Sequence, residues 1–421
     1  MTRTAPQPAP LTSSRVERAA RVLEPVVRRT PLEPNARLTE LLGRPVSLKR
    51  EDAQLCRSYK VRGAYHLISS LTPEERARGV VCASAGNHGQ GVAFACRQLG
   101  IRGRVFVPNP TPRQKRERIR ALGGDAVELV VTGSSYDEAS AAAREEERLT
   151  GAVHAHPFDD PRTIAGQGTV GRELLQQSPE PPGTVIVPVG GGGLISGIAL
   201  WLREHSPGTR IVGAEPAGAA SMRAALDKGG PVRLPELDSF VDGAAVGRVG
   251  SATYPLVRDL VDDIVPVDEG AVCTEMLDLY QTDGVIAEPA GALASAAARW
   301  AVPDSPGPVV CVTSGGNNDV SRYAEVVERS LLHVGLRHYF LVTFPQQPGA
   351  LRHFLDEVLG EGEDVVVFEY VKKNNRETGP ALVGIDLDRP EDLAGLRTRM
   401  AASPLSIEQV RPDSPLFRFL L

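Results

Sequence analysis

The sequence predicts an α/β fold in which helices cover parallel sheets and a smaller antiparallel module follows at the C-terminal end. Two observations support this prediction. From about residue 46 to residue 313, short apolar runs alternate with segments of helical periodicity, which is typical of parallel sheets with helices on both faces. After about residue 335 the predicted order becomes βαββαβ, the order of a ferredoxin-like module.

The composition describes an ordinary globular protein. The chain has 421 residues, of which 42% are hydrophobic and 24% charged, and this length suffices for two or three domains. The net charge of −5 gives no reason to expect nucleic acid or a membrane surface as a partner, and no stretch is long and apolar enough to span a bilayer. The five cysteines form no Cys-x-x-Cys pair, so we expect a reducing, cytoplasmic location without disulfides.

The first part of the chain is expected to form one domain over residues 14–335. Residues 1–13 are expected to be disordered, and a helix is expected to begin at Ser14, with Glu17 completing a capping box. A strand over 46–49 precedes a helix from Tyr59 to Leu71. The alternation then predicts further strands at 80–83, 104–107, 126–131, 153–156, 185–189, 211–214 and 309–313.

Residues 336–421 are expected to form the second domain, after a helix over about 319–334. This part contains no glycine cradle and no plausible nucleophile, so we interpret it as a binding or oligomerisation domain. Its strands are predicted at 339–344, 365–371, 381–387 and 405–410, its helices at 348–359 and 390–402, and a turn at 374–379.

Four consecutive glycines, Gly190–Gly193, lie between a predicted buried strand and a helix that begins at Leu194. Glycine has no Cβ to block close approach to the backbone, and a helix start adds unpaired N–H groups and the positive end of a dipole. Together these features predict a cradle for a phosphate dianion. The loop lacks the ending of a nucleotide P-loop and the third glycine of a dinucleotide fingerprint, so a small phosphorylated cofactor is favoured over ATP or NAD.

A lysine at a predicted helix start supplies a candidate for covalent chemistry. Lys60 lies in the first turn of the helix from Tyr59, where the positive helix end disfavours an ammonium and a reactive amine is favoured. A solvated helix start is the alternative, and spacing alone does not decide between the two. A phosphate cradle together with such a lysine suggests pyridoxal phosphate, joined to Lys60 and held by Gly190–Gly193.

Three special stretches, 84–91, 190–193 and 314–317, each follow a predicted strand. Ligands of parallel sheets bind beyond the carboxyl ends of the strands. We therefore expect the Ser314 hydroxyl to contact the pyridine nitrogen and Asn87 the phenolic oxygen of the cofactor. Ser84, with the helix start after it, is expected to meet the substrate carboxylate. A hydroxyl at the ring nitrogen, in place of a carboxylate, favours β-elimination over transamination.

Four short motifs extend this interpretation. They read Ser-Tyr-Lys-Val-Arg-Gly-Ala at 58–64, Ser-Ala-Gly-Asn-His-Gly-Gln-Gly-Val-Ala at 84–93, Val-Gly-Gly-Gly-Gly-Leu at 189–194 and Thr-Ser-Gly-Gly-Asn at 313–317. In this order they resemble the motifs of the threonine dehydratases, which are fold type II pyridoxal-phosphate enzymes. The stretches at 348–351 and 368–373 resemble the ACT-like regulatory domain of the biosynthetic form. The resemblance covers the chain from about residue 15 onward.

The resemblance implies the deaminating dehydration of L-threonine, with L-serine as a secondary substrate, to 2-oxobutanoate and ammonia. It implies that Lys60 carries pyridoxal phosphate and removes the Cα proton, and that Gly190, Gly191, Gly192, Gly193 and Leu194 hold the phosphate. Asn87 and Ser314 then contact the ring, and Ser84 lies beside the substrate. The first domain becomes the catalytic domain and the second an ACT-like regulatory domain. Isoleucine, or valine, is the implied effector, and a homotetramer is the implied assembly.

The chain also departs from its relatives. Longer members carry two ACT-like units, and this chain has room for one. In the related serine racemases, acidic residues after the strand at Glu215 bind a divalent metal, but Ser221 stands at the second acidic position, so we predict no metal site. We expect Glu288 to be a helix N-terminal carboxylate, with a place in the lining of the pocket as the alternative, and His88 to be a packed histidine. A serine lyase or racemase of the same fold and a catalytically inactive amino-acid-binding regulator are the competing hypotheses.

Overall fold

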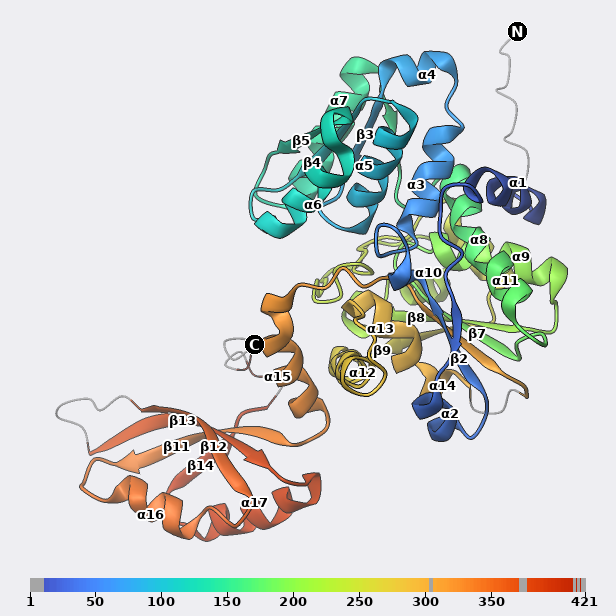
Figure 1. Cartoon of the computed structure of the whole chain (residues 1–421). Helices are drawn as coiled ribbons and strands as arrows, with labels where there is room; N and C mark the ends of the chain where they lie inside the picture. Colours follow the sequence, from blue (N-terminus) through green and yellow to red (C-terminus); the bar gives the residue numbers. More distant parts are fainter. Residues whose placement is uncertain (1–10, 303–305, 371–376, 412–413, 415–416, 418–421) are drawn as a thin grey trace. The chain divides into compact units, whose positions relative to one another are not determined.

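The computed structural model describes residues 11–302, 306–370, 377–411, 414 and 417 (Figure 1). The chain divides into two compact units. One contains the residues up to Glu269 together with Asp278–Asn318, and the other contains Gly270–Leu277 together with Asp319–Leu421. Helix α12 (Glu269–Gln281) therefore contributes to both units.

A six-stranded sheet forms the larger core of the first unit. Its order is β1-β2-β10-β7-β8-β9, and every pair is parallel except β1 with β2. Helix α13 (Pro289–Ala296) packs on β10, β7 and β8, whereas α1 (Ser13–Leu23), α8 (Pro161–Gln177) and α9 (Gly193–His205) pack together on the other face (Figure 1). The strands are β1 (Leu32–Pro34), β2 (Val46–Arg50), β7 (Thr184–Pro188), β8 (Arg210–Pro216), β9 (Asp263–Val267) and β10 (Val309–Thr313).

A four-stranded parallel sheet forms the second core of this unit, with the order β5-β4-β3-β6. Helices α3 (Lys60–Ser69), α5 (Asn87–Leu99) and α6 (Arg113–Gly123) share one hydrophobic cluster, and α7 (Tyr136–Thr150) packs on β3 and β4 through Ala139 and Ala143. The strands are β3 (Val80–Ala83), β4 (Gly103–Val107), β5 (Val127–Val131) and β6 (Val153–His154).

Shorter elements complete the first unit. The α-helices are α2 (Ala36–Leu42), α4 (Pro73–Arg78), α10 (Ser221–Lys228), α11 (Thr253–Leu260) and α14 (Ala298–Ala301), and the 3-10 turns are η1 (Glu51–Ala53), η2 (Gly124–Ala126) and η3 (Ala217–Ala219).

The second unit contains the βαββαβ module. Its sheet has the order β12-β13-β11-β14 with all pairs antiparallel, which confirms the ferredoxin-like prediction. Phe340, Val342 and Phe344 project from β11 into a core shared with the two helices. The elements are η4 (Val320–Arg322), α15 (Tyr323–His333), β11 (Arg337–Pro345), α16 (Ala350–Glu357), β12 (Glu363–Tyr370), β13 (Thr378–Leu387), η5 (Pro390–Asp392), α17 (Leu393–Ala402) and β14 (Ser406–Gln409).

The α/β prediction is confirmed, and two local predictions need correction. Helix α1 begins at Ser13 with Thr12 at its N-cap and without a side-chain cap bond, so the predicted capping box from Ser14 is wrong. Glu17 instead accepts from the Arg172 side chain at 2.6 Å, because α1 packs against α8. The helix predicted over 319–334 is divided into η4 and α15. Residues 1–10 and the first half of the predicted turn at 374–379 lie outside the described residues.

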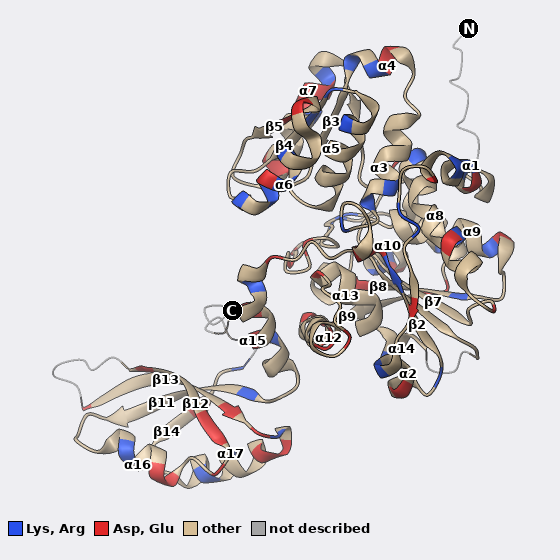
Figure 2. Ribbon diagram, viewed as in Figure 1, with Lys and Arg blue, Asp and Glu red and all other residues tan. Residues whose placement is uncertain are grey.

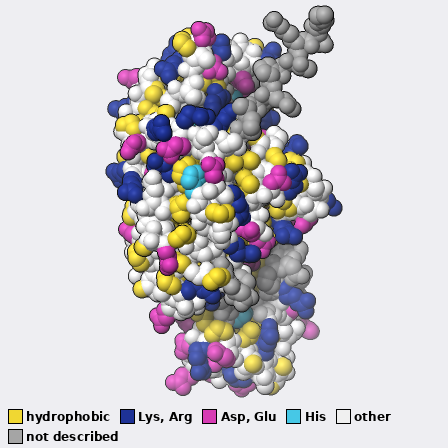
Figure 3. All heavy atoms as spheres, turned by 90° about the vertical axis from the view of Figure 1, so that its right-hand side faces the viewer, with side chains coloured by type: hydrophobic (Ala, Val, Ile, Leu, Met, Phe, Trp, Pro, Cys, Tyr) yellow, Lys and Arg dark blue, Asp and Glu magenta, His cyan; other side chains and the backbone are white. Residues whose placement is uncertain are grey.

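Charge is mixed along the chain. Figure 2 shows basic and acidic residues interspersed over helices such as α6 and α7, with acidic residues on β12. On the face drawn in Figure 3, basic, acidic and hydrophobic side chains alternate. Across the described part of the chain, every helix is too short or too polar to cross a membrane.

Candidate active site

Loops 56–59 and 314–317 pair backbone to backbone and bring Lys60 beside Ser314. The Tyr59 N–H donates to the Ser314 carbonyl with an N···O distance of 3.1 Å. This pairing connects the start of α3 with the carboxyl end of β10, across more than half of the chain. The Gly316 N–H also donates to the Arg57 carbonyl at 2.9 Å, and Ser58 and Gly315 form a β-bridge. The Asn317 side chain adds a bond from Nδ2 to the Cys56 carbonyl at 2.8 Å.

Lys60 is the first residue of α3, as predicted. Its side chain is half-buried, and Nζ donates to the Pro157 carbonyl at 3.2 Å. Two other lysines hold ion pairs instead: Lys49 Nζ lies 2.8 Å from Glu173, and Lys115 Nζ lies 2.7 Å from Asp242. Lys60 Nζ thus contacts a neutral carbonyl instead of a carboxylate, which suits the predicted imine, and its covalent role stays a prediction.

The glycine stretch turns from β7 into α9, with Gly192 at the N-cap in the left-handed region (φ 90°). None of the described residues accepts a hydrogen bond from the backbone N–H groups of Gly190–Leu194. A Cβ on Gly191 would overlap the ring of Phe158, and a Cβ on Gly193 would lie 2.5 Å from Gln167 Oε1. Free donors on a backbone that tolerates no side chain fit a phosphate group.

Asn87 begins α5 and links two parts of the site. Its Nδ2 donates to Glu288 Oε1 at 2.5 Å, and its Oδ1 accepts from Asn317 Nδ2 at 2.6 Å. These two bonds fix the orientation of the Asn87 amide. Burial, together with the charge of Asp242, raises the pKa of Glu288 to about 7.

Glu288 lies at the start of a helix, as predicted, but its carboxylate is used elsewhere. It is the N-cap residue of α13 but makes no side-chain cap bond. Its carboxylate instead faces Asn87 and lies against the backbone of Gly315, because Gly315 has no side chain to exclude it.

Ser84 and Ser314 follow β3 and β10. Ser84 Oγ accepts from the Gly86 N–H at 3.3 Å and is half-buried, so it caps the turn before α5. Ser314 Oγ is buried and donates to the Ala290 carbonyl at 3.1 Å. A contact from the Ser314 hydroxyl to a ring nitrogen therefore has to use its lone pairs or replace this bond.

His88 is packed, as predicted. Its Nε2 contacts the Ala155 carbonyl at 2.6 Å, and the ring is buried. Burial and the charge of Lys60 lower the pKa of His88 to about 3, so the ring stays neutral at physiological pH.

The sequence reasoning missed the turn at 156–159 that separates the amine from the glycine stretch. The Pro157 carbonyl accepts from both Lys60 Nζ and Gln167 Nε2, at 3.2 and 3.0 Å, while the Phe158 ring packs on Gly191. The sequence Pro-Phe-Asp-Asp at 157–160, between a strand and a helix, is a turn and N-cap signal. This local signal does not predict the long-range contacts of the turn.

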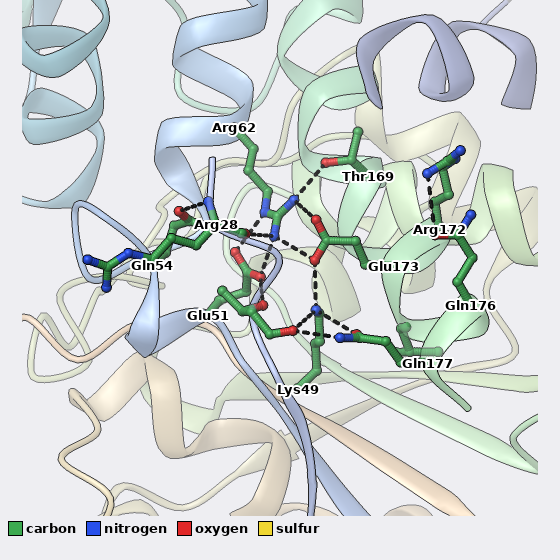
Figure 4. A network of polar contacts seen from close by, with 12 residues as sticks. Arg28, Lys49, Glu51, Gln54, Arg62, Thr169, Arg172, Glu173, Gln176 and Gln177 are labelled. Atoms are coloured by element: carbon green, nitrogen blue, oxygen red, sulfur yellow. Dashed lines mark hydrogen bonds and ion pairs between the residues drawn. The ribbon is translucent and has the colours of Figure 1, made fainter. Parts of the chain in front are cut away.

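A buried ionic network holds the helix that carries Lys60 (Figure 4). The Arg62 guanidinium lies between Glu51 and Glu173, at 2.8 and 2.7 Å. Lys49 Nζ lies 2.8 Å from Glu173 Oε2, an oxygen that Arg62 also contacts. Burial by itself would raise the pKa of Glu51. The charge and the hydrogen bonds of Arg62 outweigh burial, so the pKa of Glu51 lies below its usual value. The network joins α3 to η1, β2 and α8.

Glu215, the position after which acidic residues bind a metal in the serine racemases, has a structural use in this chain. Glu215 is fully buried, and its carboxylate accepts from the N–H groups of Met222 and Arg223 at 2.6 and 3.0 Å, at the start of α10. Burial raises the pKa of Glu215 to about 7. The absence of a metal site stays a prediction.

Comparison with known proteins places this site in a family. A model of pyridoxal-phosphate dependent enzymes matches residues 23–315, and a model of the C-terminal regulatory domain of threonine dehydratase matches residues 328–420. L-threonine dehydratase biosynthetic IlvA of Mycobacterium tuberculosis is 57% identical over 413 residues, which cover 98% of this chain and 96% of that protein. The chain belongs to the biosynthetic threonine dehydratase family.

Solved structures agree with this membership. The processed form of threonine deaminase isoform 2 from Solanum lycopersicum is 37% identical with a TM-score of 0.71, covering 78% of this dehydratase and 99% of that chain. Maize serine racemase is 34% identical with a TM-score of 0.70, covering 76% and 98%. Pyridoxal phosphate is the cofactor of the family, and the free N–H groups at Gly190–Leu194 suit its phosphate.

Proposed function

We propose that this threonine dehydratase converts L-threonine to 2-oxobutanoate and ammonia by β-elimination, as the first step towards isoleucine. The observation that carries the proposal is the convergence of Lys60, Gly190–Leu194 and Ser314 at the ends of the strands. In the reaction, threonine loses its Cα proton and its Cβ hydroxide. The enamine that is released becomes an imine, which water hydrolyses to the keto acid and ammonia.

Each site residue has a role that follows from its place. When bound, pyridoxal phosphate withdraws electrons from the Cα of the amino acid. Lys60 holds the cofactor, and its Nζ accepts the Cα proton. The Pro157 carbonyl, which accepts a hydrogen bond from Nζ, orients this amine. The N–H groups of Gly190–Leu194 hold the phosphate. Asn87, whose amide is fixed by Glu288, contacts the ring oxygen.

The remaining polar groups complete the proposed site. Ser314 contacts the ring nitrogen, and Ser84 lies beside the substrate. The start of α5 directs its first N–H groups, with the positive end of the helix dipole, at the substrate carboxylate.

Turnover of L-threonine and L-serine by the purified enzyme tests this function. We expect higher kcat/KM on threonine, and Lys60→Ala is expected to lose both turnover and the visible absorbance of the bound cofactor. Lys228→Ala, which removes an exposed lysine at the end of α10, serves as the control. Preference for serine would favour a serine lyase or racemase, and absence of cofactor absorbance in the unaltered enzyme would favour an inactive regulator.

We also propose that the second unit binds isoleucine, or valine, as a feedback inhibitor. A cavity of about 270 Å³ lies between α17 and β14. Apolar side chains of Phe340, Met400 and Ile407 share its lining with the polar Ser403 and Gln409 and with Arg397, which is exposed. This arrangement suits a branched aliphatic side chain with a carboxylate at the open end.

Filling this cavity tests the effector site separately from the reaction. Ala401→Trp places an indole in the cavity wall and is expected to weaken isoleucine inhibition while threonine turnover is kept. Ala394→Trp, an exposed position on the same helix, is the matched control. Unchanged inhibition in Ala401→Trp would place the effector elsewhere.

We further propose a homotetramer that acts in the cytoplasm. All five cysteines are buried, and none of them forms a disulfide with another described residue, which suits a reducing compartment. Light scattering of the purified enzyme measures the assembly, and a mass other than that of four chains would contradict the tetramer.

A further inference from the structure

The Asp159 carboxylate binds the loop 250–252, which lies just before Thr253. Its carboxylate accepts from the N–H of Ser251 at 2.9 Å, from the Ser251 hydroxyl at 3.0 Å and from the N–H of Ala252 at 2.7 Å. A Cβ on Gly250 would overlap Asp159 Oδ1. The carboxylate therefore fits closely into a loop that lies more than ninety residues away in the sequence.

The residue after this loop reaches the proposed phosphate cradle. Thr253 is fully buried at the start of α11, and its Oγ1 donates to the Gly191 carbonyl at 2.6 Å. In a trans peptide the C=O and the next N–H point in opposite directions. Because Thr253 holds the Gly191 carbonyl on one side, the Gly192 N–H faces the other side.

The turn that carries Asp159 also contacts the glycine stretch directly. The ring of Phe158 lies against Gly191, and the Cβ and Cα atoms of Phe158 lie against Gly193. His156 Nδ1 accepts from the N–H groups of Phe158 and Asp159 at 3.3 and 2.8 Å, which requires a neutral ring. Burial, together with neighbouring His154, lowers the pKa of His156 to about 4, so this support is kept at physiological pH.

We propose that Asp159 is a positioning residue for the cofactor phosphate: through loop 250–252 and Thr253 it sets the peptide plane whose N–H binds the phosphate. This inference rests on the proposed function, because it requires the phosphate to bind at Gly190–Leu194. It assigns Asp159 no contact with the reacting atoms.

Asp160, the residue after Asp159, provides a matched control for the loss of a carboxylate in this turn. Asp160 is the N-cap of α8, where Oδ1 accepts from the Arg162 N–H at 2.7 Å and its carboxylate pairs with the Arg162 side chain at 2.9 Å. The two adjacent aspartates thus serve different partners. Loss of Asp160 weakens a helix start, whereas loss of Asp159 releases the loop that anchors the glycine stretch.

The experiment compares binding of pyridoxal phosphate with binding of pyridoxal, which lacks the phosphate. The full-length enzyme is freed of cofactor and titrated with each compound, and imine formation is followed by absorbance. Asp159→Ala is expected to weaken pyridoxal phosphate binding by roughly tenfold or more, as for the loss of charge-assisted hydrogen bonds, and to change pyridoxal binding by less than about twofold. Thr253→Val is expected to reproduce this selective loss, and Asp160→Asn is expected to spare both ligands.

Three results would overturn the inference: unchanged binding of both ligands by Asp159→Ala, equal weakening of both, or an equal phosphate-selective loss in Asp160→Asn. If Asp159→Ala does not fold, Asp159→Asn and Thr253→Val give the same comparison. Failure of the unaltered enzyme to bind pyridoxal phosphate at Lys60 would instead contradict the proposed function itself.

Discussion

At the scale of single residues, glycine at 191 shows how closely the site is packed. The backbone there has Phe158 on one side and a carbonyl held by Thr253 on the other. A larger residue has to displace an aromatic ring that is itself held by the turn at 156–159. The absence of a side chain is therefore a packing requirement as well as a means of exposing N–H groups.

Gly191→Ala is expected to lower pyridoxal phosphate affinity by roughly tenfold or more and to reduce the free energy of unfolding by about 1–3 kcal/mol, because overpacking strains the turn. Cofactor titration and urea unfolding measure the two effects. Gly208→Ala is the control, since a Cβ there meets no heavy atom within 4 Å. The addition of Phe158→Ala is expected to restore part of the lost stability, and no restoration would show that the ring is not the obstacle.

Glu288 is a buried acid whose carboxylate accepts a hydrogen bond from Asn87, the predicted contact of the cofactor ring. Its pKa is raised from 4.5 to about 7, so the folded protein binds this proton more tightly than the unfolded chain. The stabilising contribution is fully present below about pH 4.5 and is lost as the pH rises through about 7.

Relative to the unaltered protein, Glu288→Gln is expected to gain stability between pH 5 and pH 8, by on the order of 2 kcal/mol at the upper end. The amide keeps an acceptor for Asn87 and has no proton to lose. Urea unfolding of the cofactor-free, full-length protein across this range measures the difference. Glu236→Gln, at an exposed position, is the control. A stability difference that does not vary with pH would refute the prediction.

At the scale of secondary structure, α3 depends on charges that come from other elements. Arg62 and Glu51 are both fully buried, and Glu173 on α8 completes the contact. Burial lowers the pKa of Lys49 below its usual value, although the charges of Glu51 and Glu173 act in the opposite direction. A buried pair of this kind adds little beyond an apolar pair, but its disruption leaves a charge without a partner.

Arg62→Met is therefore expected to cost about 3–5 kcal/mol of unfolding free energy, because Glu51 stays buried without its cation. Urea unfolding measures the loss. Arg148→Met removes an exposed pair on α7 and is expected to leave stability almost unchanged. If Arg62→Met were as stable as Arg148→Met, the network would not hold α3 in place.

At the scale of the whole molecule, the chain contains a catalytic unit and a unit that matches a regulatory domain. The second unit keeps its own hydrophobic core around Phe340, Phe344 and Phe354. The strands and the two helices of the second unit therefore have a hydrophobic core of their own.

A chain that ends after Val334 is expected to keep threonine turnover and to lose isoleucine inhibition. Leu332 of α15 packs on residues of the removed sheet, so a second truncation after Asn318 controls for exposure of that helix. Turnover with and without isoleucine measures both effects. Equal inhibition of the truncated and full-length enzymes would place the effector site outside the removed residues.

The sequence by itself determined the alternating elements, the βαββαβ module, the glycine turn after β7 and the place of Lys60 at the start of α3. These features depend on hydrophobic periodicity and turn chemistry, which act over a few residues. Strand ends were predictable for the same reason, and with them the edge where the site lies.

Only the tertiary structure decided which remote groups meet at that edge. Distant segments are joined where loop 56–59 pairs with loop 314–317 and where Asp159 accepts a hydrogen bond from Ser251. The same holds for Arg62, which is buried between Glu51 and Glu173. No local pattern encodes such contacts, because they depend on how sheets and helices pack and on which side chains that packing leaves facing one another.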